Sequence, residues 1–281
     1  MAEYTLTDGV LTILPGTRYI CSQEFSERDD IHRVVIPVGV GFMEDECFAG
    51  CQNLEEVSIS EGMISIGPAA FGECSALKEV HLPGTLKSID SGAFLFCESL
   101  KNILLPDCLE SIGEMAFQGS GLVRISVPAS VSRIEECAFF SCEALRRADV
   151  LGKETYIGRD AFGCNDLLTE GFIASGYPKD ADAAAKLLYT LLWCGTFERH
   201  EESTSERARA YIQNNQQIIM ERILKTNNIP AMTGLEKLGL LSSETIASGL
   251  VEALKNNRTE LSALLLKMQR SVGLSEEEFE L

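Results

Sequence analysis

A regular series of phenylalanines is the feature that most restricts how this chain can fold. Successive members are separated by 23, 23, 23, 23, 22 and 23 residues, and they are Phe25, Phe48, Phe71, Phe94, Phe117, Phe139 and Phe162. A fixed period of this length is typical of solenoids, in which each period is one supersecondary unit. Such a unit cannot bury its own apolar side chains, so we expect neighbouring units to stack around a shared core.

Two further apolar positions recur in each period and predict a short strand. The residues twelve and fourteen positions before each phenylalanine are apolar, as with Ile36 and Val34 or Leu105 and Ile103. This alternation has the period of two that indicates a strand with one buried face. Proline follows the strand in four periods, and its missing amide donor is expected to end the ladder there.

The repeated segments resemble a known family. Residues 77–94 read LKEVHLPGTLKSIDSGAF and residues 100–117 read LKNILLPDCLESIGEMAF. Both resemble BspA-like leucine-rich repeats, whose pattern is L-x-x-I-x-I-P…I-x-x-x-A-F-x-x-C-x-x-L. The resemblance covers roughly residues 10–170 and weakens at the terminal periods, for example at Glu24. It implies a curved solenoid of about seven 23-residue coils with short strands on its concave face, and it implies no enzyme activity.

The period stops after Leu168, which predicts a change of architecture. Glycine and proline in residues 174–179, ASGYPK, indicate a junction. We therefore predict an α+β chain with a leucine-rich repeat solenoid over residues 1–172 and an all-helical domain over 173–281. Apolar stripes with helical spacing predict five helices, near residues 181–195, 204–226, 231–239, 243–256 and 259–270.

Capping patterns and a weak resemblance add detail to the helical domain. A hydroxyl residue followed three positions later by a carboxylate predicts helix starts at Ser203, Thr233 and Ser275. Residues 229–268 resemble the ankyrin-related helical pairs that follow such repeats in some bacterial proteins. That resemblance implies a cover for the open end of the solenoid or a second binding surface.

The cysteines follow the repeat. Of ten cysteines, four occupy the same position three residues after the phenylalanine, namely Cys51, Cys74, Cys97 and Cys142. The shortened period places Ser120 at this position. Free cysteine is among the most frequently buried residue types, so buried reduced thiols are the favoured interpretation and disulfides the alternative. Cys47 and Cys51 lack the further ligands that zinc requires, so no metal site is predicted.

Charge restricts the classes of partner. Residues 1–172 carry 27 Asp and Glu against 12 Lys and Arg, a net charge of −15, whereas residues 173–281 carry 15 against 12. An acidic solenoid is a poor match for nucleic acid or anionic membranes, which are bound through cations. The sequence has no membrane span and no signal-peptide pattern, which predicts a cytoplasmic protein. The alternative is a secreted or surface protein whose leader is absent from this chain.

No residues are predicted to be catalytic and no cofactor is expected. His32, His81 and His200 have no nucleophile or metal-ligand partner at a meaningful spacing, so they are interpreted as solvated side chains. The glycine-containing strings match neither a P-loop nor a dinucleotide-binding motif. We therefore expect a protein that is not an enzyme.

The outward strand positions are the predicted binding surface. Residues between the buried positions must face outward, and in the coils from the second onward they form two rows. The candidate residues are Arg33, Val35, Glu56, Ser58, Glu79, His81, Asn102, Leu104, Arg124, Ser126, Arg147 and Asp149. Acidic coils followed by basic ones suit an extended protein or peptide partner. A solvated strand face with no partner is the alternative.

Overall fold

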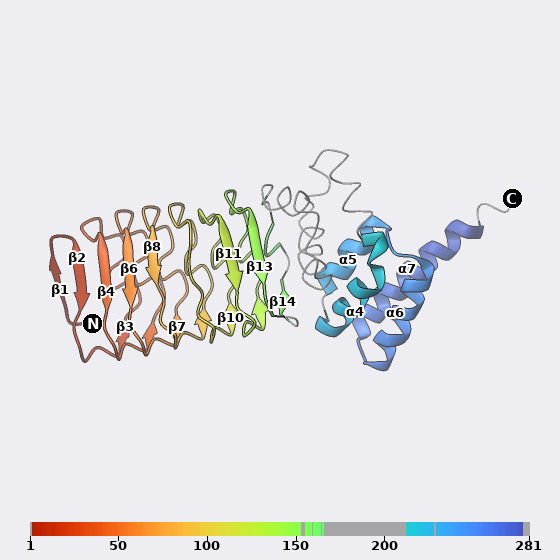
Figure 1. Ribbon diagram of the computed structural model, residues 1–281, viewed down its shortest axis with the longest axis horizontal. Coiled ribbons are helices and arrows are strands. Elements are labelled where there is room, and N and C mark those ends of the chain that lie inside the picture. Colours follow the sequence, from red (N-terminus) through yellow and green to blue (C-terminus); the bar gives the residue numbers. More distant parts are fainter. Residues whose placement is uncertain are drawn as a thin grey trace. The chain divides into compact units, whose positions relative to one another are not determined.

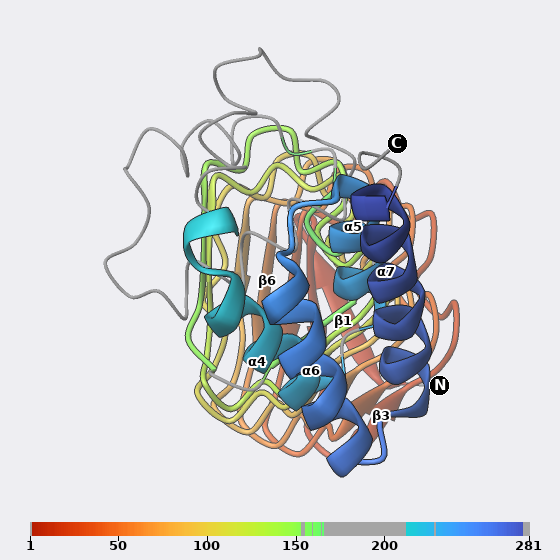
Figure 2. The same cartoon turned by 90° about the vertical axis from the view of Figure 1, so that its right-hand side faces the viewer.

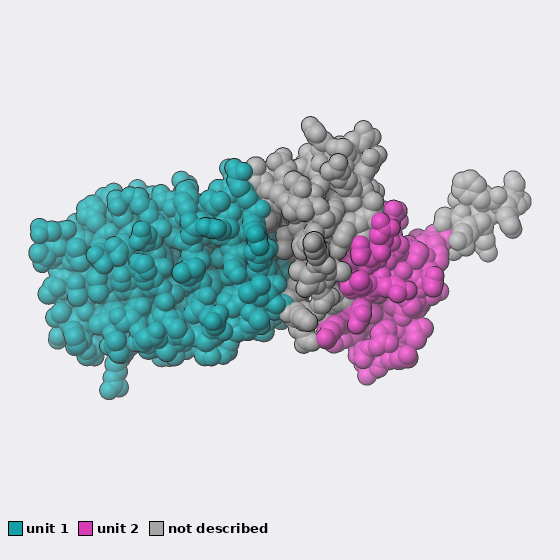
Figure 3. All heavy atoms as spheres, in the orientation of Figure 1, with its two compact units in different colours: residues 1–172 teal, residues 173–281 magenta. Residues whose placement is uncertain are grey.

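The computed structural model describes residues 2–152, 155–158, 160–163, 165, 212–227 and 229–277. The chain forms two compact units, Met1–Phe172 and Ile173–Leu281 (Figure 3). The first unit is a β-solenoid of about 23 residues per turn, and the second is helical over the part that the structure describes (Figure 1). The predicted boundary at residue 172 lies outside the described residues.

The coils of the solenoid form two rows of short strands, and one coil contributes to only one of them. The longer strands are β1 Tyr4–Thr7, β2 Val10–Ile13, β4 Arg33–Ile36, β6 Glu56–Ile59, β8 Glu79–His81, β11 Arg124–Val127 and β13 Arg147–Val150. Strands β1, β2, β4, β6 and β8 form one sheet in that order, and β11 pairs with β13 in a separate sheet. All these pairs are parallel except β1 with β2, an antiparallel hairpin at the N-terminal end (Figure 1).

A second sheet, which the sequence did not predict, runs without interruption through the coils. Its two-residue strands are β3 Tyr19–Ile20, β5 Phe42–Met43, β7 Ser65–Ile66, β9 Ser88–Ile89, β10 Ser111–Ile112, β12 Arg133–Ile134 and β14 Tyr156–Ile157. The last residue of each strand is buried in the core, for example Ile66 and Ile112. Figure 2 shows the coils overlying one another when they are viewed along their row.

The core is a continuous stack of the seven phenylalanine rings. Neighbouring ring centroids lie 4.9–5.5 Å apart with interplanar angles of 0–12°. All seven side chains are at most 1% exposed, which confirms the predicted stacking. The Tyr4 ring meets Phe25 edge-on at 5.0 Å and closes the N-terminal end of the stack. Glu24 contributes to the same end, because its carboxylate accepts hydrogen bonds from the amides of Ala2 and Cys21.

Four helices are described in the second unit, α4 Gln216–Thr226, α5 Ile229–Leu238, α6 Ser243–Lys255 and α7 Thr259–Glu277. Helix α6 packs on α7 and α4, and α5 packs on α7. A close approach fixes α4 against α6, because a Cβ added at Gly249 would lie 2.6 Å from the Met220 sulfur. Lys267 Nζ also lies 2.6 Å from Glu236 Oε1 and links α7 to α5.

Several predicted helix limits require correction. Helix α4 begins at Gln216, because Asn215 at φ −125° and ψ 20° is not helical, so the predicted 204–226 helix is not continuous. Thr233 is no N-cap, since α5 begins at Ile229 and the Thr233 hydroxyl donates to the Ile229 carbonyl. Helix α7 passes through Ser275, so no helix begins there. The helix predicted over 181–195 and the cap at Ser203 lie outside the described residues.

Candidate functional site

The longer strands place most of the predicted binding residues on one surface, which we call the first face. The register aligns Arg33 with Glu56 and Glu56 with Glu79, and it aligns Arg124 with Arg147. The parallel row aligns Val35, Ser58 and His81 across β4, β6 and β8, and it aligns Ser126 with Asp149 across β11 and β13. The first face therefore gathers ten of the predicted residues on strands, all partly or fully exposed.

The other two predicted residues, Asn102 and Leu104, lie in a segment that forms no strand. Residues 101–106 separate β8 from β11, and we call them the interruption. Two of its carbonyls accept backbone hydrogen bonds, that of Lys101 from the Val123 amide and that of Pro106 from the Leu109 amide, and none of its amides donates one. Leu104 is 88% exposed. The predicted strand at Ile103 and Leu105 is therefore wrong, and Leu105 is only half-buried.

Two features of the sequence coincide with the interruption. The next coil is the one that is shorter by one residue, so the interruption adjoins the single irregular spacing of the phenylalanines. Asparagine at 102 adds a residue that is disfavoured in strands. In the preceding coil, Leu82 directly follows β8, and it is also half-buried although its position in the repeat predicts burial.

Ion pairs neutralise the two ends of the first face but not its middle. Arg33 lies 2.8 Å from Glu56, and Arg147 lies 2.6 Å from Asp149. The hydrogen bond to Asp149 raises the pKa of the Arg147 guanidinium. In the middle, Glu79 has only His81, at 3.7 Å, and Arg124 donates to the neutral Asn102 side chain at 3.4 Å. Opposite charges thus flank the interruption, and within the described residues neither pairs with a lysine, an arginine or a carboxylate.

Behind the face, the cysteine positions form a ladder of hydrogen-bond donors. Each thiol donates to the carbonyl of the phenylalanine one coil earlier, as Cys51 does to Phe25 at 3.1 Å and Cys97 to Phe71 at 3.2 Å. Asn165 takes the same role in the last described coil, donating to Phe139 at 2.9 Å. The Ser120 hydroxyl instead bonds the Cys142 thiol at 3.3 Å.

The thiol ladder is structural in character. All eight described cysteines are free, and the four ladder cysteines are fully buried. Burial raises the pKa of Cys51 to about 11, and it raises those of Cys74 and Cys97 as well. A protonated thiol is a poor nucleophile and a poor metal ligand. Within the described residues, no group of three or more histidine, cysteine or acidic side chains is placed to hold a metal.

The second sheet carries an outward row that the sequence analysis missed. Tyr19 and Phe42 are 52% and 54% exposed and lie in register on β3 and β5. Ser88 donates to Ser65 at 2.8 Å farther along the row. The signal was available, because these residues stand six positions before each core phenylalanine.

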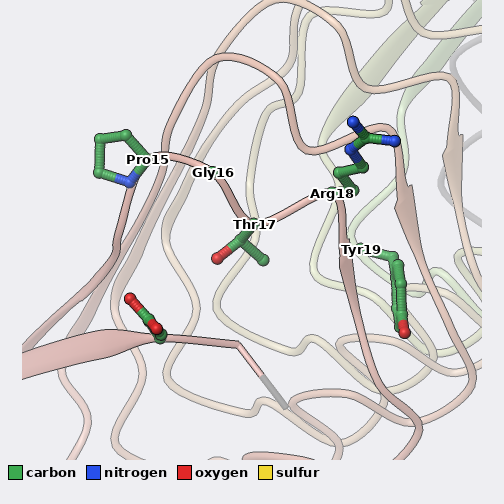
Figure 4. A pocket seen from close by; sticks show the side chains of 6 residues that line it. Pro15, Gly16, Thr17, Arg18 and Tyr19 are labelled. Atoms are coloured by element: carbon green, nitrogen blue, oxygen red, sulfur yellow. The ribbon is translucent and has the colours of Figure 1, made fainter.

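A shallow recess lies at the N-terminal end of this second row (Figure 4). It has a volume of about 380 Å³ and is lined by Glu3, Pro15, Gly16, Thr17, Arg18 and Tyr19. The recess mixes charges of both signs with one aromatic ring. It has no nucleophile and base in hydrogen-bond contact, so its geometry indicates no chemical reaction.

The comparison with protein families decides the classification of the repeats. Residues 9–107 and 64–176 match the family model described as BspA type leucine rich repeat region, with six copies. The chain belongs to this family. Leucine-rich repeat proteins of this kind are generally protein-interaction or surface-type modules and are typically non-catalytic. A comparison with curated protein sequences finds no match.

Solved structures with similarity to the chain are bacterial leucine-rich repeat proteins. One from Bacteroides ovatus has 26% identity and a TM-score of 0.46, over 59% of this chain and 44% of that protein. One from Eubacterium ventriosum has 26% identity and a TM-score of 0.49, over 54% and 42%. A leucine-rich cell surface protein from Faecalibacterium prausnitzii has 30% identity and a TM-score of 0.42, over 53% and 38%. The chain therefore spans less than half the length of each of these three proteins.

None of the helices that the structure describes has both the length and the apolar character needed to cross a lipid bilayer.

Proposed function

We propose that this chain is a non-catalytic protein–protein interaction module that binds a protein or peptide partner through the first face. The observation that carries the proposal is the alignment of outward side chains across successive coils, which presents Arg33, Glu56 and Glu79 as one row. Such a row offers an extended partner many contacts of defined charge. Charge complementarity of this kind favours specificity and rapid association.

Nucleic acid is disfavoured as the partner. The chain has a net charge of −18 at pH 7, and two of the three arginines of the first face, Arg33 and Arg147, already pair with carboxylates there. Binding to phosphates depends on several free cations. A protein or peptide that carries both charges fits the first face better.

The test is capture of partners from the native host with matched variants of the full chain. The variant Arg124→Glu/Arg147→Glu reverses two charges on the first face. The control Arg28→Glu/Arg133→Glu makes the same charge change elsewhere, and each of its arginines pairs with a carboxylate two residues later, as Arg147 does. We expect a partner that is recovered with the unmodified chain and the control to be lost with the first-face variant. Equal recovery with both variants would remove the first face as the site.

We propose the cytoplasm as the compartment. Support comes from the thiol ladder, because reduced cysteines persist where thiols are kept reduced. The alternative is a secreted or surface adhesin-like module, as in members of the resembled family. Fractionation of the native cells separates the two, since recovery of the chain in the medium or at the surface would contradict the cytoplasmic location.

A further inference from the structure

At the interruption, backbone amides and an apolar side chain are not used by the fold of the solenoid and can contact a partner. The amides of residues 101–105 make no hydrogen bond in the structure, whereas the Lys78 and Glu79 amides, which are equivalent to those of Lys101 and Asn102, both donate to the Glu55 carbonyl one coil earlier. Leu104 is the most exposed of the large apolar side chains in the described residues, at 88%. Backbone donors and an apolar side chain are thus available at one point of the first face.

Glu79 and Arg124, which form no ion pair with a lysine, an arginine or a carboxylate in the described residues, lie on either side of that point. Glu79 belongs to the coil before the interruption and Arg124 to the coil after it. Leu104 belongs to the coil between them and lies in the parallel row, two residues beyond Asn102, so a negative charge, an apolar side chain and a positive charge occupy three successive coils. Neighbouring coils of a parallel sheet are about 4.8 Å apart, which separates the two charges by about 10 Å. An extended peptide places alternate side chains on one side about 7 Å apart, so its first and fifth residues lie about 14 Å apart, and long charged side chains at these two positions reach inward to Glu79 and Arg124.

We propose that Glu79, Leu104 and Arg124 recognise an extended five-residue segment of a protein partner. The first residue of this segment is basic, the third is apolar and the fifth is acidic. The basic side chain faces Glu79, the apolar one covers Leu104, and the acidic one faces Arg124. The peptide backbone bonds the amides of residues 102–105. This inference rests on the proposed function and specifies the chemistry of the partner at the first face.

The test is selection of a displayed library of random seven-residue peptides on the full-length protein. We expect enrichment of peptides with the basic, apolar and acidic pattern. Leu104→Asp is expected to reduce their binding at least tenfold. Arg124→Glu is expected to weaken them about fivefold and to select peptides that are basic at both ends instead. Leu151→Asp serves as the control, because Leu151 is 59% exposed and follows β13.

The outcomes separate the two proposals. Peptides that lose binding with Leu104→Asp but show no charge order would overturn the inference and leave the first face as the binding surface. Peptides that bind the unmodified protein, Leu104→Asp and Arg124→Glu equally well would overturn both. A library without any enriched peptide would also contradict both. Circular dichroism of each variant checks that the fold is retained.

Discussion

The two sheets of the solenoid are made by the same coils, yet one is continuous and the other is broken. The second sheet runs through seven strands from β3 to β14. The longer strands divide into a five-stranded and a two-stranded sheet around residues 101–106. Since both sheets share one core, the difference shows that a coil can lose a strand without losing its place in the stack.

The core explains why this loss is tolerated. The ring of Phe117, in the coil of the interruption, lies 5.2 Å from both Phe94 and Phe139, as close as rings elsewhere in the stack. Cys97 still donates to the Phe71 carbonyl at the start of this coil. Burial and inward hydrogen bonds hold the coil, which leaves its outward segment free for contacts with a partner.

The largest expected effect tests whether the phenylalanine stack stabilises the coil that contains the interruption. Phe117→Ala removes a fully buried ring from the stack, and such changes typically cost about 3–5 kcal/mol. We expect urea unfolding followed by circular dichroism to show a loss in this range. A decrease of less than about 1 kcal/mol in the free energy of unfolding would mean that the stack does not stabilise the coil that contains the interruption.

The next effect concerns pH and the buried thiols. Burial raises the pKa of Cys51 to about 11, whereas an unfolded cysteine titrates near pH ~8.5. The unfolded chain therefore loses a proton that the folded chain keeps, so the stability present below pH ~8.5 falls as the pH rises toward 11. The expected loss is about 3 kcal/mol for this thiol. Unfolding of Cys51→Ser from pH 8 to 11 should show a shallower decline, and an identical decline would contradict the assignment.

A smaller effect tests the role of the ladder as a set of donors. Cys97→Ala removes the donor to the Phe71 carbonyl, and loss of one partner of a buried hydrogen bond costs about 1–3 kcal/mol. Cys97→Ser keeps a donor and should cost less. If serine destabilises the protein as much as alanine does, packing of the sulfur rather than its hydrogen bond explains the ladder.

The smallest effect is expected at the interruption. Leu104→Ala should change the free energy of unfolding by no more than about 0.5 kcal/mol, because the side chain is 88% exposed. Leu100→Ala is the matched control, since Leu100 is fully buried in the same coil and its truncation should cost about 2–5 kcal/mol. Similar losses for the two variants would show that Leu104 is packed.

The sequence predicts the core well because the repeat constrains it directly. A side chain at a constant offset must point the same way in every coil, so the stacked rings and buried positions such as Val34 and Ile36 follow from spacing alone. The second sheet does not follow, because its strands have only two residues and show no alternation. In the helical part, Thr233 has capping spacing but lies inside α5, whereas Ser242 is the N-cap of α6 and accepts from the Thr245 amide.

For the candidate site, the sequence predicts which side chains face outward but not how they are paired. The apolar pattern at Leu100, Ile103 and Leu105 matches that of the other coils, so the apolar positions give no sign of the interruption. The ion pairs of Arg33 and Arg147 depend on the positions of neighbouring side chains. Only the structure therefore distinguishes the neutralised ends of the first face from its charged middle.

Amide hydrogen exchange on the full chain tests the central claim most directly. Two adjoining segments, residues 100–107 and 108–115, belong to the same coil and differ in that only the second contains a strand, β10. The account predicts fast exchange for the amides of residues 102–105 and strong protection for Ser111 and Ile112. Equal, strong protection of both segments would show that the row of longer strands continues through residues 101–106, and it would contradict the account.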